Sequence, residues 1–90
     1  MTTLNNDFVD AQLMYQRFPQ TFEVPDPKRL KALKIGDQVK ICANNERFWT
    51  QVIRISGHVI EAIVMNDLIS NGWLVGEPVV FERDNIYAID

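Results

Sequence analysis

The chain has 90 residues, of which 47% are hydrophobic and 23% charged, values typical of one small globular domain. Its formal net charge of −3 argues against a constitutive nucleic-acid-binding protein. The single cysteine excludes an intrachain disulfide and a zinc site built from several cysteines. No secretory signal or apolar stretch of about 20 residues is found, so we expect a cytoplasmic protein with no membrane partner.

Residues 7–18 predict an amphipathic helix. Its apolar stripe consists of residues at three- and four-residue spacing, namely Leu4, Phe8, Ala11, Tyr15 and Phe18. Asn6 or Asp7 can cap the start of this helix, and Pro19 ends it. A helix this short is unstable alone, so we expect it to pack on the rest of the chain.

Residues 19–34 predict a connector that contains one short helical turn. Asp26 followed by Pro27 is a favourable pair for the N-cap and first position of such a turn. We expect Leu30 and Leu33 to face the core. The basic residues of this segment are expected in solvent: Lys28, Arg29, Lys31 and Lys34.

Residues 35–90 alternate apolar and polar positions between frequent turn signals, which is typical of a small all-β unit. Strands are expected at 38–43, 47–56, 59–65 and 79–81, with a 3₁₀ turn and a closing strand within 85–89. Closure protects the edges of short antiparallel strands. The expected fold is therefore mostly β (α+β): a small SH3-like, partly open antiparallel β-barrel with the N-terminal helix packed on it. We expect one domain over 1–90, made of the helix (1–18), the connector (19–34) and the barrel (35–90).

The turn at Asn44-Asn45 fixes which side chains enter this barrel. A loop of two or four residues makes odd positions of the first strand face even positions of the second. Val39 and Ile41 are then expected inside the barrel with Phe48 and Val52.

The same alternation places Trp49, Ile53 and Ile55 on the outer face of the long strand. Water disfavours an exposed apolar patch of this kind. We therefore predict that the N-terminal helix covers this patch and that Trp49 has a structural role.

Several short strings between residues 33 and 89 are similar to strings in a bacterial family. They are Ile35-Gly36-Asp37 with Val39-Lys40, Glu46-Arg47-Phe48-Trp49 with Val52, Gly57, Asn66-Asp67-Leu68, Gly76-Glu77 with Val79 and Phe81, and Asn85-Ile86. Through them the chain resembles domain-of-unknown-function family 2314 (YegJ-like). It departs from the family at Gly76-Glu77, where the family has a second Gly-Asp, and at Ala62, where the family has a glycine. The resemblance implies a small β-rich domain and supplies neither an activity nor functional residues.

Catalytic and metal-binding patterns are weak. Cys42 and the single histidine, His58, allow a nucleophile–base dyad, but a buried thiol and a solvated imidazole are the favoured interpretation. One cysteine and one histidine do not close a structural zinc site. Glu82 and Asp84 fit a solvated turn, and the isolated glycines form no phosphate loop. We therefore predict a non-enzymatic protein without catalytic residues, cofactor or metal.

Charge is unevenly distributed along the chain. Seven basic and two acidic residues give residues 28–54 a net charge of +5, and one basic and six acidic residues give residues 55–90 a net charge of −5. A basic face with Lys40, Arg47 and Arg54 near Trp49 would suit RNA. Pairing between strands of the two segments would instead neutralise this charge, and we favour that alternative. For Arg47 we expect a carboxylate partner near Asp37 or Glu46.

Trp73 is the remaining candidate for a binding residue. It follows the turn signal Asn71-Gly72 and is expected near a loop tip, either as a partner contact or as a lid over one end of the barrel. We predict a non-catalytic protein-interaction module in which Trp73 and Asn71 contact an unknown protein partner. The alternative is a small-barrel RNA-binding module that uses residues 28–54, with Lys40, Arg47 and Arg54. Self-association is compatible with both.

Overall fold

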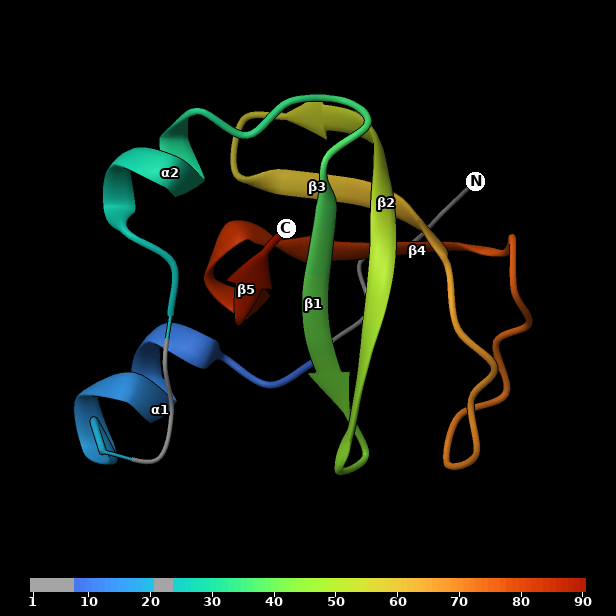
Figure 1. The fold of residues 1–90 in the computed structure, drawn as a ribbon, viewed down its shortest axis with the longest axis horizontal. Helices are drawn as coiled ribbons and strands as arrows, with labels where there is room; N and C mark the ends of the chain where they lie inside the picture. The colour runs from blue at the N-terminus through green and yellow to red at the C-terminus, as the bar shows by residue number, and fades with distance from the viewer. Residues whose placement is uncertain (1–7, 21–23) are drawn as a thin grey trace.

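The computed structural model describes residues 8–20 and 24–90 (Figure 1). Two short helices, α1 (Ala11–Arg17) and α2 (Pro27–Lys31), precede the strands. The strands are β1 (Gln38–Ala43), β2 (Glu46–Ser56), β3 (Val59–Val64), β4 (Pro78–Glu82) and β5 (Ala88–Ile89), with the 3₁₀ turn η1 (Arg83–Asn85) before β5. All pairs are antiparallel, in the order β4-β3-β2-β1-β5. The described part of the chain is therefore mostly β, and its strand pairing does not close the sheet.

The β1–β2 hairpin confirms the predicted alternation. The turn residues of Asn44-Asn45 have φ angles of 51° and 62°, as a two-residue type I′ turn requires. This turn places Ile41 opposite Phe48 and Val39 opposite Thr50. All four side chains are buried, and the Thr50 hydroxyl donates a hydrogen bond of 3.1 Å to the carbonyl oxygen of Val39.

A register shift in β2 reverses the alternation further along the strand. The shift lies between Val52 and Arg54, where β2 pairs with β3. Beyond it Ile55 lies opposite Ile60 and packs against the core, so the prediction that Ile55 points outward is wrong. One extra residue in a strand turns every later side chain to the other face. Figure 1 shows β2 bending in this part, so that β3 and β4 cross behind β1.

The bent sheet encloses a single main core. Its buried members come from β1 to β4, from α2 and from segments outside the named elements: Phe8, Leu30, Leu33, Val39, Ile41, Ala43, Phe48, Val52, Ile60, Ala62, Val64, Val79, Phe81 and Ile86. Leu30 and Leu33 thus face inward as predicted. The predicted cap of α2 is also confirmed, because the Asp26 carboxylate accepts a hydrogen bond of 2.8 Å from the backbone amide of Lys28 and Pro27 opens the helix.

The helix α1 is shorter than the predicted helix. It begins at Ala11, and the side chain of Asp10 caps it by accepting a hydrogen bond of 3.0 Å from the backbone amide of Leu13. The predicted caps Asn6 and Asp7 lie outside the described residues. Residues 8–10 are not helical, because Phe8 forms an isolated β-bridge with Ala43 and the backbone of Asp10 is extended.

This extended segment determines where α1 packs. The backbone amide of Val9 donates to the carbonyl oxygen of Cys42 at 2.9 Å, next to the end of β1. Ala11 then packs with Cys42 and Tyr87, and α1 lies beside η1, away from the middle of β2 (Figure 1). The prediction that the N-terminal helix covers Trp49 is therefore wrong for the described helix. Pairing with β1 directs α1 past the edge of the sheet.

Candidate interaction surface

The connection between β3 and β4, residues 65–77, is held in place by Glu46 at the start of β2. Its carboxylate accepts hydrogen bonds from the backbone amides of Ile69 and Ser70, at 2.7 and 3.0 Å, and from the Asn71 amide nitrogen Nδ2 at 3.0 Å. The Ile69 amide is the main cause of a lowered pKa for Glu46. Glu46 is thus a charged acceptor that fixes a loop more than twenty residues away.

Asn71 provides the second anchor of this loop. Its Nδ2 also donates to the carbonyl oxygen of Ala43 at 3.1 Å, and its Oδ1 accepts from Nδ2 of Asn44 at 2.7 Å. The tip of the β1–β2 hairpin and the β3–β4 loop therefore lie side by side. Asn71, which the sequence put forward as a partner contact, is half-buried and hydrogen-bonded to Ala43, Asn44 and Glu46.

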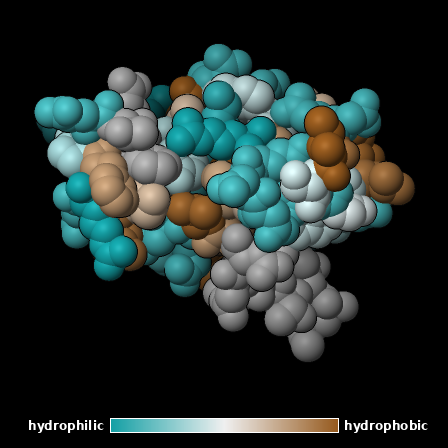
Figure 2. Space-filling model, turned by 90° about the horizontal axis from the view of Figure 1, so that it is seen from below, coloured by the Kyte–Doolittle hydropathy of each residue, from teal (hydrophilic) through white to brown (hydrophobic). Residues whose placement is uncertain are grey.

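Although its backbone is anchored, the loop exposes three aliphatic side chains. Ile69 is 95% exposed, Leu74 is 68% exposed and Val75 is 54% exposed. Figure 2 shows hydrophobic side chains gathered at its right-hand side, where Figure 1 places the β3–β4 loop. The sequence interpretation missed these residues. The signal was three aliphatic residues between loop-forming positions, without the alternation of a strand.

Trp73 lies in the same loop but points toward the core. Its ring stacks on Phe8 with 5.3 Å between the centroids, and it lies 6.0 Å from the ring of Phe48. Phe8 is in turn 5.8 Å from Phe81. These contacts match the alternative in which Trp73 covers one end of the core. The ring also links the loop to the N-terminal segment.

The outer face of β1 and β2 carries two pairs of a cation and an aromatic ring. Nζ of Lys40 lies 5.1 Å from the centroid of the Trp49 ring, and Trp49 is half-buried. The guanidinium carbon of Arg47 lies 4.8 Å from the centroid of the Tyr87 ring. The register of β1 and β2 places each cation beside its ring. Lys40 is opposite Trp49, and Arg47 is opposite Cys42, which packs with Tyr87.

The carboxylates of Asp37 and Glu46, near which a partner for Arg47 is expected, contact other groups. Glu46 is occupied by the β3–β4 loop, and Asp37 lies 3.7 Å from Arg29. Arg47 and Glu46 are adjacent in β2, so their side chains project to opposite faces of the sheet. Arg54, the third predicted basic residue, is exposed and lies opposite Glu61 in the register of β2 and β3.

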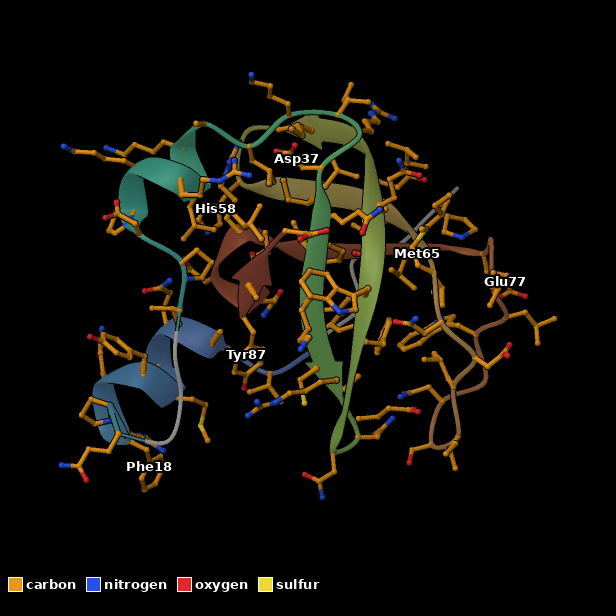
Figure 3. All side chains as sticks on the ribbon, in the orientation of Figure 1. Phe18, Asp37, His58, Met65, Glu77 and Tyr87 are labelled. Carbon is orange, nitrogen blue, oxygen red and sulfur yellow. The ribbon has the colours of Figure 1, made fainter. Side chains whose placement is uncertain are left out.

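Cys42 and His58 do not come together. Cys42 lies opposite Arg47 at the hairpin end of β2, whereas His58 lies in the turn at the other end of this strand. In Figure 3, His58 is close to α2, and Tyr87, which packs with Cys42, is close to α1. Nε2 of His58 lies 3.5 Å from Oδ2 of Asp84. Burial raises the pKa of the Cys42 thiol, and Arg47 lowers it to a smaller extent.

In residues 8–20 and 24–90, no three side chains of histidine, cysteine, aspartate or glutamate come together as metal ligands. None of the helices described there is long and apolar enough to cross a membrane. Comparisons with protein-family models, curated proteins and solved structures found no match to this chain.

Proposed function

We propose that this protein is a non-catalytic protein-interaction module that binds its partner through the β3–β4 loop. The contact surface, called the loop surface below, consists of Ile69, Leu74 and Val75 with the exposed acidic residues Asp67 and Glu77. The exposure of three aliphatic side chains on an anchored loop is the observation that carries this proposal. Exposed apolar groups favour association, and a backbone fixed before binding loses less entropy on binding.

The proposed partner contact differs from the one expected from the sequence. Trp73 supports the loop from below through its stacking on Phe8, and Asn71 fixes it through hydrogen bonds. The partner then touches the aliphatic residues that flank them. In this arrangement Trp73 and Asn71 act as positioning residues for the surface.

We also propose that the fold is an SH3-like barrel with α1 packed on it. The strand order supports this assignment, because β1 pairs with both β2 and the short β5, and a 3₁₀ turn precedes β5. Assignment to domain-of-unknown-function family 2314, and with it a bacterial and cytoplasmic setting, is a proposal that rests on the strings around Glu46-Arg47-Phe48-Trp49.

A capture experiment tests the loop surface. Immobilised wild type and the Leu74→Asp variant are compared by quantitative mass spectrometry of the proteins they retain from the native host. The matched control is Leu13→Asp, because Leu13 is also an exposed leucine, 41% accessible, but lies on α1. We expect Leu74→Asp to lose partners that Leu13→Asp retains. Identical retention by all three proteins would refute the loop surface.

The pair of Lys40 and Trp49 favours single-stranded RNA as a second candidate ligand. A half-buried indole beside an ammonium group can stack on a base while the cation contacts the phosphate. Titration with single-stranded RNA should then quench the fluorescence of Trp49. We expect the Lys40→Gln variant to bind RNA more weakly than wild type, and added salt to weaken RNA binding by both proteins. A Trp73→Phe background isolates the signal of Trp49. Unchanged fluorescence in about 0.05 M salt would exclude this candidate, since phosphate contacts are strong there.

A further inference from the structure

A second surface of the molecule has the same design as the loop surface but the opposite charge. It is formed where the chain enters β1 and where β2 bends, and we call it the turn surface. Its members are the exposed residues Lys34, Ile35, Ile53 and Arg54. Ile35 is 69% exposed and Ile53 is 42% exposed, so that this surface also presents aliphatic groups to solvent.

Backbone hydrogen bonds hold the two parts of the turn surface together. The amide of Gly36 donates to the carbonyl oxygen of Val52 at 2.8 Å, and the amide of Val52 donates to the carbonyl oxygen of Asp37 at 2.9 Å. Ile35 and Ile53 are the chain neighbours of these bonded residues. The turn is fixed further because the Asp37 carboxylate accepts a hydrogen bond from the backbone amide of Lys34 at 2.9 Å.

The charges of the two surfaces are complementary. Lys34 and Arg54 each adjoin an isoleucine of the turn surface. Two half-buried acidic residues lie beside them: Asp37 is 3.7 Å from Arg29, and Glu61 is opposite Arg54 in the register of β2 and β3. Residues 65–77 around the loop surface contain two acidic residues, Asp67 and Glu77, and no lysine or arginine. Each surface therefore has exposed aliphatic side chains next to charged residues, basic on the turn surface and acidic on the loop surface. The two surfaces are complementary in this respect.

The two surfaces are built from different elements and do not overlap. In Figure 3, Asp37 marks the upper side of the molecule, where the turn surface lies, and Glu77 marks the right-hand side, where the loop surface lies. A copy that offers its turn surface to a neighbour therefore keeps its own loop surface open. Contacts between two different surfaces of identical chains are heterologous, and they continue beyond a dimer into rings or filaments.

We propose that the partner of the loop surface is the turn surface of a second copy of this chain, so that the protein assembles head to tail. This inference rests on the proposed function, because it names the occupant of the same surface. Apolar contact supplies the attraction, and Lys34 and Arg54 of one copy orient it against Asp67 and Glu77 of the next. The interface belongs to the weak class, and assembly is expected to depend on protein concentration.

Two variants, each with one surface altered, test the head-to-tail arrangement. Leu74→Asp damages the loop surface, Ile35→Asp damages the turn surface, and Leu13→Asp is the matched control on α1. Sedimentation velocity is measured for each protein from dilute solution up to about 1 mM, the weak end of useful affinities. Thermal unfolding verifies that all variants are folded.

Wild type and Leu13→Asp should exceed the monomer mass of 10.4 kDa progressively as concentration rises, and more so at low salt. Each damaged variant alone should stay monomeric. An equal mixture of Leu74→Asp and Ile35→Asp should form dimers and nothing larger, because the mixture has one intact loop surface and one intact turn surface for every two molecules.

Two results would overturn the inference. If wild type stays at 10.4 kDa at all concentrations, the chain does not self-associate and the inference is wrong. Whether the loop surface binds a different protein is then tested by the capture experiment alone. A wild-type dimer that Ile35→Asp leaves intact shows that the turn surface is not the occupant, although the loop surface still binds protein if Leu74→Asp abolishes that dimer. Failure of the head-to-tail arrangement is thus distinguishable from failure of the proposed function.

Discussion

Phe48 and Trp49 are adjacent in β2 and have opposite environments. Phe48 is 2% exposed and contacts the rings of Phe8 and Trp73, whereas Trp49 lies half-buried on the outer face beside Lys40. We predict that Phe48→Ala lowers the free energy of unfolding by about 3–5 kcal/mol, because it leaves a cavity in the core.

Trp49→Ala is the matched comparison. It should lower the free energy of unfolding by about 1 kcal/mol or less, since it removes a surface contact. Urea unfolding followed by circular dichroism measures both values. Equal losses for the two variants would contradict the outer-face position given to Trp49.

Glu46 makes the anchoring of the β3–β4 loop dependent on pH. The hydrogen bond from the amide of Ile69 is the first cause that lowers the pKa of Glu46 below its ordinary value of 4.5. The folded state therefore binds the proton less readily than the unfolded state. The contribution of Glu46 to stability is complete above the ordinary pKa and is lost as the pH falls through the lower pKa of the folded state.

A comparison of wild type with Glu46→Gln measures this contribution. We predict that wild type is the more stable protein at pH 7 and that the difference in unfolding free energy shrinks as the pH falls below about 4.5. The control is Glu77→Gln, because Glu77 is an exposed acidic residue of the same loop. A difference that is unchanged between neutral and acid pH would contradict the role given to the carboxylate.

At the scale of elements, the β1–β2 hairpin depends on the left-handed conformation of its turn. Asn45 has a φ of 62°, a conformation that glycine and asparagine tolerate and β-branched residues do not. We predict that Asn45→Val lowers the unfolding free energy by about 1–2 kcal/mol and that Asn45→Gly leaves it unchanged or raises it. The midpoint of urea unfolding measures both. Equal midpoints for the two variants would contradict the type I′ turn.

The same hairpin shows which features of a strand pair can be predicted from the sequence and which cannot. Strand β1 and the inward side chains of the first half of β2 follow from the Asn44-Asn45 turn and from alternation, which are local signals. The outward prediction for Ile55 failed because nothing nearby in the sequence marks the register shift after Val52. A bulge depends on how the whole sheet bends, so alternation alone does not locate it.

Contacts between distant segments of the chain are the other feature that the sequence did not predict. Asp26 and Pro27 predicted the start of α2, because a cap lies within one turn of its helix. The pairing of Phe8 with Ala43, which moves α1 away from Trp49, and the hydrogen bonds of Glu46 to the β3–β4 loop join residues far apart in the chain. No periodicity or spacing specifies such contacts, and they determine which part of the loop is exposed.

At the scale of the whole molecule, stability is expected at two levels. The strands share one core and should unfold together. By contrast, Ala11 is the only fully buried residue of α1, so little surface is exposed when this helix detaches. Cys42 reports on both events, because it packs under Ala11 and is 8% exposed.

Alkylation of Cys42 at increasing urea concentration separates the two levels. Burial raises the thiol pKa and restricts access, so we predict slower labelling in the native protein than in free cysteine. At low urea concentration, where detachment of α1 exposes the thiol, the labelling rate should depend weakly on urea. It should depend steeply on urea only at the concentrations where tryptophan fluorescence reports global unfolding. Ala11→Asp should speed labelling in the weak regime, because a carboxylate does not fit between Cys42 and Tyr87. If labelling instead follows the fluorescence transition from the lowest urea concentration, α1 and the sheet unfold as a single unit.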